Sequence, residues 1–210
     1  MHRHTEIGTT TFKVLRIGIG LFTFQMVFAI LTGSLSLLSD TAHVGGDILA
    51  ITLVFLAQEI AARIDESTGE VRVEHYHNVE LGATAVNGLI LLIVAYVLFR
   101  EAVDRLSDPP QVSSAILVPG IVGFLVNLLM LRMLKEKREH LTVQSAAAHI
   151  TFDLLASVGV ITAGFLILAT GERLVDPVIS LLIIVLIVIW GTRLIVGSYL
   201  ILIRQNGSNV

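Results

Sequence analysis

The sequence predicts an all-α integral membrane protein with six transmembrane helices, and three observations lead to that prediction. Hydrophobic residues make up 54% of the 210 residues and charged residues only 15%, whereas a soluble domain carries about 25% charged residues. Six apolar segments are each long enough for the roughly 30 Å hydrocarbon core of a bilayer, which takes about 20 residues. The segments are continuously apolar rather than alternating, which favours helices over a β-barrel.

The six expected spans follow one another with short polar breaks. They cover residues 12–32, 35–60, 79–101, 112–134, 142–169 and 175–203. Gly33-Ser34 predicts a tight turn after the first span, and Asp108-Pro109-Pro110 predicts the end of the third. Asp176-Pro177 places a proline in the first turn of the sixth span, where a backbone N–H has no helical partner. Polar connections over residues 63–78 and 135–140 separate the other spans.

Basic residues indicate the orientation, because cytoplasmic loops are enriched in lysine and arginine. Of the 14 lysines and arginines, ten fall on the side of the two termini, three fall on the other side, and Arg193 lies within the last span. The ten are Arg3, Lys13, Arg16, Arg63, Arg72, Arg132, Lys135, Lys137, Arg138 and Arg204, and the three are Arg100, Arg105 and Arg173. Both termini are therefore expected in the cytoplasm. Since only residues 205–210 follow the sixth span, we expect a single membrane domain over 1–210 and no soluble domain.

Two histidine–aspartate pairs inside apolar spans are the main functional signal. His43 and Asp47 are four residues apart, as are His149 and Asp153, so each pair shares one face of its helix. Two such helices in contact would offer two nitrogen and two oxygen ligands, the number that tetrahedral Zn²⁺ requires. Ionisable side chains are costly in lipid and mark functional sites. With no cysteine in the chain, thiolate sites are excluded and Cu(I) is disfavoured.

Other interpretations of the pairs stay open. In a purely structural helical bundle, each pair would be a hydrogen bond that satisfies buried polar groups. An intramembrane zinc metallohydrolase would keep one coordination position for water and need a nearby general base. The sequence has no HExxH motif, and Asp40 is the one further acidic residue placed to act as that base. A metal-sensing membrane protein is another alternative.

Three more residues are possible accessory groups. Asp40 lies one turn before His43 on the same helix face, where it could line the exit path, relay protons or make a local hydrogen bond. His75 and His77 lie in the acidic connection before the third span, where they could collect cations at the cytoplasmic mouth. A solvated loop is the alternative that the sequence favours for these two histidines.

Four motifs resemble the signatures of the cation diffusion facilitators. The second span carries Gly33-Ser34-x8-His43-x3-Asp47, including Leu38-Ser39-Asp40-Thr41-Ala42, and the fifth carries Ala146-Ala147-Ala148-His149-x3-Asp153-x3-Ser157-Val158-Gly159-Val160. The third span, with His77-Asn78-Val79-Glu80 and Asn87-Gly88, and the sixth, with Asp176-Pro177, are also similar to the family pattern. The resemblance extends over essentially the whole chain.

This resemblance implies a secondary active transporter rather than an enzyme. The expected function is a divalent-cation exporter driven by proton exchange, with His43, Asp47, His149 and Asp153 as a quartet of the kind associated with Zn²⁺. Cd²⁺, Co²⁺ or other divalent cations are possible substrates, and no nucleic acid is expected as a partner. The family's habit also implies a homodimer, and we expect a multi-pass protein of the cell membrane, namely the bacterial inner membrane. The family's usual cytosolic C-terminal domain and its histidine-rich loop before the fifth helix have no counterpart in this sequence.

Overall fold

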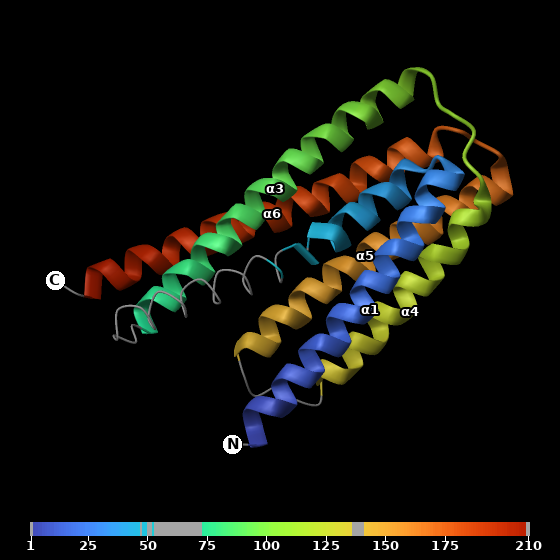
Figure 1. Ribbon diagram of the computed structural model, residues 1–210. Coiled ribbons are helices and arrows are strands. Elements are labelled where there is room, and N and C mark those ends of the chain that lie inside the picture. Colours follow the sequence, from blue (N-terminus) through green and yellow to red (C-terminus); the bar gives the residue numbers. More distant parts are fainter. Residues whose placement is uncertain (1, 47, 50–51, 53–72, 136–140, 209–210) are drawn as a thin grey trace. The chain divides into compact units, whose positions relative to one another are not determined.

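The computed structural model describes all residues except 1, 47, 50–51, 53–72, 136–140 and 209–210. Its helices are α1 (His2–Thr32), α3 (Val73–Ser107), α4 (Leu117–Lys135), α5 (Leu141–Thr170) and α6 (Val175–Ser208), with a short 3₁₀ helix, η1 (Ser114–Ile116), before α4 (Figure 1). Residues 35–46 are also helical, and we call them the second helix. No β-strand occurs in the described parts of the chain. The predicted all-α fold class is therefore confirmed.

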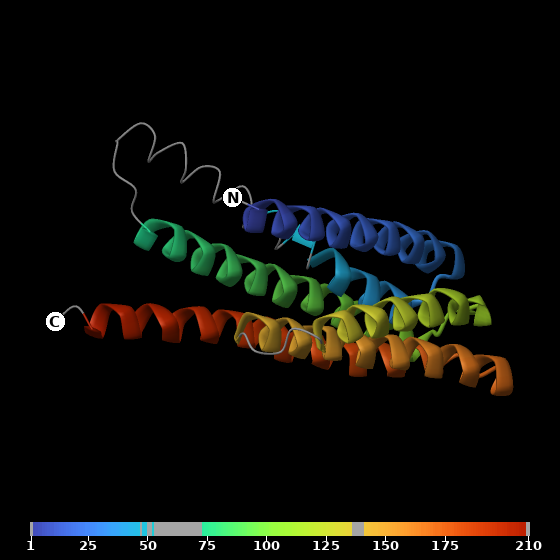
Figure 2. The same cartoon turned by 90° about the horizontal axis from the view of Figure 1, so that it is seen from below.

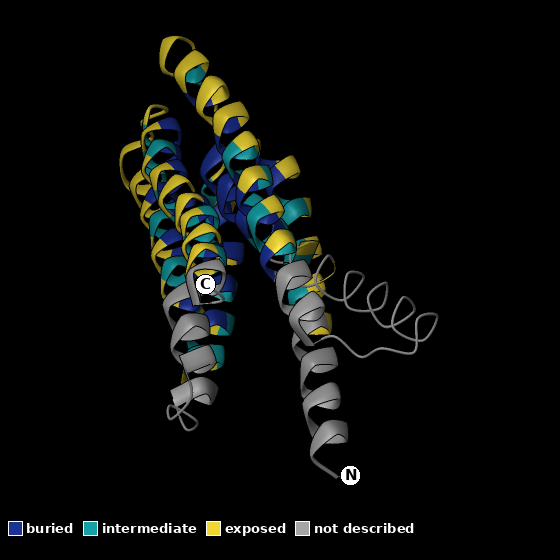
Figure 3. Cartoon of the chain, turned by 90° about the vertical axis from the view of Figure 1, so that its left-hand side faces the viewer, coloured by how far each residue is buried: buried dark blue, intermediate teal, exposed yellow. Residues whose placement is uncertain are grey.

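Four of these helices are long and apolar enough to cross a membrane. They contain the stretches Leu81–Ser107, Ser114–Arg132, Ile150–Thr170 and Val175–Arg204, and a shorter apolar stretch covers Arg16–Thr32. Large exposed apolar side chains along them, such as Leu129, Phe165 and Leu182, suit contact with lipid tails. Figure 3 shows such exposed positions alternating with buried ones along the same helices. The chain is a multi-pass membrane protein. The second predicted span, 35–60, extends into residues outside the described set, so the count of six spans stays a prediction.

Turn residues follow the helices, at Gly33 and at Asp108-Pro109-Pro110 as the sequence predicts, and also at Gly171. Gly33 follows α1 with φ +66° and Gly171 follows α5 with φ +68°, a left-handed conformation that favours glycine after a helix. α3 ends at Ser107, just before the Asp-Pro-Pro break. The predicted 112–134 span begins later than expected, as η1 and then α4, because Ser113 caps η1 by accepting a hydrogen bond from the Ala115 N–H.

The described chain divides into two compact units, and the first contains His43 and Asp153. It comprises Met1–Gly45 and Val97–Leu186, that is α1, the second helix, the end of α3, α4, α5 and the start of α6. Here α4 and α5 run side by side (Figures 1 and 2). An added Cβ at Gly164 would lie 2.7 Å from Leu117 Cγ, and one at Gly120 would lie 3.1 Å from Ile161 Cγ1. Small residues therefore let these two helices approach closely.

The second unit comprises Gly46–Tyr96 and Ile187–Val210. Within it, the backbones of α3 and α6 approach each other at two glycines. An added Cβ at Gly88 would lie 2.7 Å from the Gly191 carbonyl oxygen, and one at Gly191 would lie 3.1 Å from the Gly88 carbonyl oxygen. Any larger residue at either position would push the two helices apart.

Candidate metal-transport site

The second helix, which carries His43, is anchored at its N-terminus by a carboxylate from α6. Asp176 is fully buried, and its Oδ1 accepts hydrogen bonds from Ser34 Oγ (2.7 Å), Ser36 Oγ (2.6 Å) and the Ser36 N–H (3.2 Å). Its Oδ2 accepts from the Leu35 N–H at 2.7 Å. Ser34 is also the N-cap, because its Oγ accepts from the Leu37 N–H at 3.1 Å. The first backbone donors of the helix are thus satisfied, and a negative charge lies at the positive end of its dipole.

This anchor also fixes the direction of the second helix relative to α5. The second helix begins beside Asp176, only a few residues beyond the end of α5 at Thr170. The two helices therefore run antiparallel within the first unit (Figure 1). Moving forward along the second helix and backward along α5 therefore leads in the same direction, away from Asp176.

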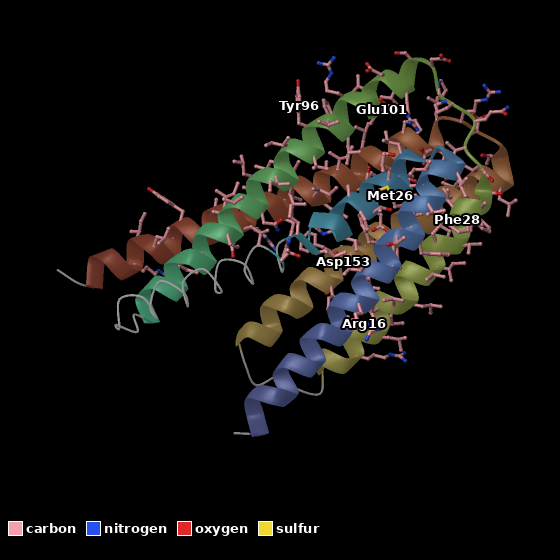
Figure 4. All side chains as sticks on the ribbon, viewed as in Figure 1. Arg16, Met26, Phe28, Tyr96, Glu101 and Asp153 are labelled. Atoms are coloured by element: carbon pink, nitrogen blue, oxygen red, sulfur yellow. The ribbon has the colours of Figure 1, made fainter. Side chains whose placement is uncertain are left out.

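His43 and Asp153 meet at the contact between these helices. His43 Nε2 lies 3.1 Å from Asp153 Oδ1, with both side chains almost fully buried; Figure 4 labels Asp153 on α5, where the second helix passes it. With metal–ligand distances of about 2.0–2.2 Å, two ligand atoms of a tetrahedral Zn²⁺ site lie about 3.3–3.5 Å apart. The observed separation is within a few tenths of an ångström of that value. The contact therefore brings one member of each predicted pair to the spacing of two ligands on one ion.

Asp40 lies beside this contact and is held from a third helix. Gln25 Nε2, on α1, donates a hydrogen bond of 2.9 Å to Asp40 Oδ2, and both residues are 1% exposed. Asp40 also interacts electrostatically with Asp153 and with His43. The bond from Gln25 is the one hydrogen bond that the Asp40 carboxylate accepts from the described residues. A buried carboxylate with a single neutral donor is poorly compensated for its lost hydration. The neighbourhood therefore favours a positive charge.

Gly123 on α4 leaves the space that the Gln25 side chain occupies beside Asp40. An added Cβ at Gly123 would lie 2.7 Å from Gln25 Nε2 and 3.3 Å from Ser157 Oγ of α5. The amide of Gln25 and the hydroxyl of Ser157 therefore converge on one bare stretch of the α4 backbone. Four helices of the first unit contribute to this polar interior: α1, the second helix, α4 and α5.

The structure describes the side chains of only two of the four predicted metal ligands. His43 and Asp153 are described and in contact. Asp47 lies outside the described residues, and so do the side chains of His149, His75 and His77, although these three residues are on helices α5 and α3. Among the described side chains, no three histidine, aspartate or glutamate groups form a cluster with metal-binding geometry. The full four-ligand site therefore remains a prediction that one contact supports.

Two residues of this neighbourhood, Gln25 and Asp176, are not among the site residues that the sequence predicts. Gln25 is a single amide within the apolar first span, and its isolation among hydrophobic neighbours was the signal that could have identified it. The sequence predicts Asp176 at the start of the sixth helix, and the structure confirms this. Its hydrogen bonds to residues 140 to 142 positions earlier in the chain have no signal in the local sequence.

Comparison with known proteins places the chain among transporters of metal ions. The sequence model of the cation efflux transmembrane domain matches residues 14–203. The chain belongs to the cation efflux family. It is 28% identical to a "Cadmium, cobalt and zinc/H(+)-K(+) antiporter" of Bacillus velezensis, over 100% of this chain and 68% of that protein. Family membership identifies the chain as a transporter and not an enzyme, which removes the metallohydrolase interpretation.

Two further relatives agree with this assignment. The chain is 35% identical to the "Metal cation efflux system protein CzcD" of Cupriavidus metallidurans, over 87% of this chain and 58% of that protein. It is 31% identical to "Zinc transporter ZitB" of Escherichia coli, over 85% of this chain and 57% of that protein. The matched part of the chain thus corresponds to between 57% and 68% of the length of these three cation efflux proteins.

Proposed function

We propose that this cation efflux protein exports Zn²⁺ in exchange for protons, through one tetrahedral site formed by His43, Asp47, His149 and Asp153. The single observation that carries the proposal is the 3.1 Å contact between His43 Nε2 and Asp153 Oδ1. Because the two helices are antiparallel, one further turn along each in the same direction should bring Asp47 opposite His149. The two histidine–aspartate pairs can supply four ligands to one ion only if their helices face each other. The contact between His43 and Asp153 is the contact expected between two such helices.

The same atoms can couple the cation to protons. Imidazole and carboxylate groups bind a metal only when they are deprotonated, so cation binding releases protons and protons compete for the emptied site. Imidazole has an ordinary pKa near about 6.5, which makes this competition effective close to neutral pH. A bound cation or bound protons neutralise the carboxylate charge, which would otherwise lie unpaired in the membrane interior. The protein can therefore switch between its inward-open and outward-open states when the site is occupied.

The substrate proposal rests on ligand chemistry and on the names of the relatives. Two nitrogen and two oxygen ligands suit Zn²⁺, and two relatives are named for zinc transport, one of them also for cadmium and cobalt. We therefore propose Zn²⁺ as the principal substrate, with Cd²⁺ and Co²⁺ as further substrates. The cation is cargo in this proposal and not a resident cofactor.

Zinc flux into proteoliposomes that contain a pH-sensitive dye tests the function and its site together. Wild type should move Zn²⁺ with an opposing proton flux, and Asp153→Ala should move neither while it still inserts and folds. Asp108→Ala is the matched control, since Asp108 is an exposed acidic residue after α3. Undiminished exchange by Asp153→Ala would show that the histidine–aspartate pairs only hold helices together. Absence of flux from folded wild type would reject the transport proposal itself.

We also propose the predicted membrane arrangement: six spans, both termini in the cytoplasm, a homodimer, and the bacterial inner membrane as location. The bacterial relatives and the membrane-length helices support the location. Because the chain has no cysteine, single cysteines introduced at Asn206 and at Gln111 can be labelled from one side of the membrane at a time. Asn206→Cys should react only from the cytoplasmic side and Gln111→Cys only from the other, and the reverse pattern would contradict the orientation.

A further inference from the structure

A row of buried polar groups continues from the His43–Asp153 contact towards Asp176, and the transport site proposed above does not use it. Asp40 lies one turn before His43 on the second helix, and Ser157 lies one turn after Asp153 on α5. In antiparallel helices these two steps lead in the same direction. Asp40, Ser157 and Gln25 are each no more than 1% exposed. They therefore occupy one level of the interior of the first unit, adjacent to the level of the transport site.

Ser157 differs from the other helical hydroxyl groups of this unit. The buried hydroxyls of Ser39, Thr41 and Ser180 each donate to the carbonyl oxygen four residues earlier, at 2.7–2.8 Å. That local hydrogen bond is the usual way for a buried helical hydroxyl to be satisfied. Ser157 Oγ, although fully buried, has no hydrogen-bond partner among the described residues. Its hydroxyl is thus free for a ligand between the helices.

The side-chain oxygen of Gln25, Oε1, is, like Ser157 Oγ, buried without a hydrogen-bond partner among the described residues. The other end of the same amide, Gln25 Nε2, donates to Asp40. Buried polar atoms are rarely left unpaired, and those that are call for an explanation such as an ion or water. Gly123 leaves room for the Gln25 amide beside Ser157. Two neutral oxygens without hydrogen-bond partners among the described residues, Gln25 Oε1 and Ser157 Oγ, therefore lie at the same level as the Asp40 carboxylate. This level is next to the His43–Asp153 contact.

We propose that Gln25, Asp40 and Ser157 form a second, oxygen-lined station for a divalent cation in transit, one helical turn from His43–Asp153 on the side of Asp176. Carboxylate, amide and hydroxyl oxygens are hard ligands, and a divalent ion that keeps part of its water shell can be shared among them. The station holds the ion less firmly than the two imidazoles and two carboxylates of the transport site do. Under the predicted orientation it lies on the extracytoplasmic side, where the ion leaves the transport site.

This inference rests on the proposed export function and makes a separable prediction. A station on the exit path changes how fast an ion leaves, while the affinity of the transport site is set by the histidine–aspartate ligands. Removing one station oxygen should therefore lower the maximal Zn²⁺ flux about tenfold or more, as expected for one lost interaction with a charged group. Equilibrium Zn²⁺ affinity in detergent should stay within about threefold of wild type. A purely structural role would instead lower stability and affect binding and flux together.

Three variants on three helices test the station. Gln25→Met keeps the length of the side chain but loses the amide, and Ser157→Ala removes only the hydroxyl oxygen. Gly123→Ala changes none of the three station residues. Its methyl group would lie 2.7 Å from Gln25 Nε2 and should therefore displace the Gln25 amide. If Gly123→Ala acts through Gln25, the double variant Gln25→Met/Gly123→Ala should transport no more slowly than Gln25→Met alone.

Gly120→Ala is the matched control for tight packing on α4. Its methyl group would lie 3.1 Å from apolar atoms of Val160 and Ile161 on α5 and near no station residue, so it adds strain one turn away without a polar consequence. It should retain wild-type flux. Should Gln25→Met fail to fold, Ser157→Ala decides alone, because the change is small.

The outcomes separate this inference from the export function. Wild-type exchange, its loss in Asp153→Ala, and low flux with retained Zn²⁺ affinity in Gln25→Met and Ser157→Ala would support the station. Wild-type flux in both of those variants would overturn the station and leave the export function standing. Equal loss in Gly120→Ala and Gly123→Ala would also overturn it, as would weaker Zn²⁺ binding in proportion to the lost flux. No exchange by wild type would overturn both proposals.

Discussion

Two buried aspartates of the first unit, Asp176 and Asp40, differ in how completely their carboxylates are hydrogen-bonded. Asp176 accepts four hydrogen bonds, two from backbone N–H groups and two from serine hydroxyls. Asp40 is equally buried, yet it accepts one hydrogen bond, from Gln25, among the described residues. Four donors and a helix N-terminus can replace the lost hydration of a carboxylate, and a single amide donor cannot.

The difference separates a structural acid from a functional one. A carboxylate whose oxygens are all occupied has no capacity left for a cation, and it stabilises the fold at all times. A buried carboxylate with few donors gains stabilisation when a cation arrives, as expected for an acid that serves transport. The same comparison applies to Asp153, whose Oδ1 faces an imidazole at 3.1 Å and can exchange that contact for a shared ion.

The largest expected effect on stability comes from breaking the structural anchor. Asp176→Ala leaves two backbone donors and two serine hydroxyls without their acceptor in a fully buried place. Removing one partner of a buried charged network typically costs about 3–5 kcal/mol, so we expect a clearly lower melting temperature and poor yield in detergent. Asp108→Ala, at an exposed position, is the control. A melting temperature equal to that of wild type would show that the anchor is not needed for stability.

Zinc should stabilise the protein through the transport site and not through the anchor. A ligand that binds only the folded state at about 100 times its dissociation constant adds about 2.7 kcal/mol of stability. We expect Zn²⁺ to raise the melting temperature of wild type, to have no effect on Asp153→Asn, and to raise that of Asp176→Asn from a lower starting value. A Zn²⁺-dependent rise in Asp153→Asn equal to that in wild type would place the binding site elsewhere.

The identity of the ligands should set the ion preference. His43→Asp replaces an imidazole nitrogen with a carboxylate oxygen and so favours harder ions such as Mn²⁺ over Zn²⁺. We expect the ratio of Mn²⁺ to Zn²⁺ flux to rise about tenfold, which corresponds to about 1.4 kcal/mol between the two ions. Competition between the two ions in proteoliposomes measures this ratio directly. If the preference is unchanged, selectivity is decided at another level of the path, such as Gln25–Asp40–Ser157.

Much of the fold could be predicted from the sequence because the bilayer imposes simple rules. Apolar length alone locates the long helices: it predicts a span over 142–169, and α5 covers Leu141–Thr170. Helices also extend beyond the apolar spans, since α3 begins at Val73 and ends at Ser107 rather than covering only 79–101. Hydropathy detects the part of a helix that suits lipid, and polar residues can continue the same hydrogen-bonding pattern outside it.

The candidate site was predictable only in its local part. A four-residue spacing places each histidine–aspartate pair on one face of its helix, but it does not say which helix faces meet. The contact between His43 and Asp153 is visible only in the structure. Asp176 and Gln25 reach across the fold to residues of the second helix. Such partners depend on how several helices pack together, and spacing within one segment carries no information about them.

The smallest expected effect comes from an acid that is neither buried nor central. Glu101 accepts a 2.7 Å hydrogen bond from Arg105 Nε one turn along α3, and the Glu101 side chain is 49% exposed. Water screens this pair, so Glu101→Gln should lower stability by no more than about 0.5 kcal/mol. Arg105 Nη1 also donates to the Gly33 carbonyl oxygen at 2.6 Å, and this second contact should keep the arginine in place. Thermal melting at low and high salt checks the prediction. A loss close to that of Asp176→Ala would show that exposure is a poor guide to the role of a carboxylate in this protein, and would weaken the distinction between its structural and functional acids.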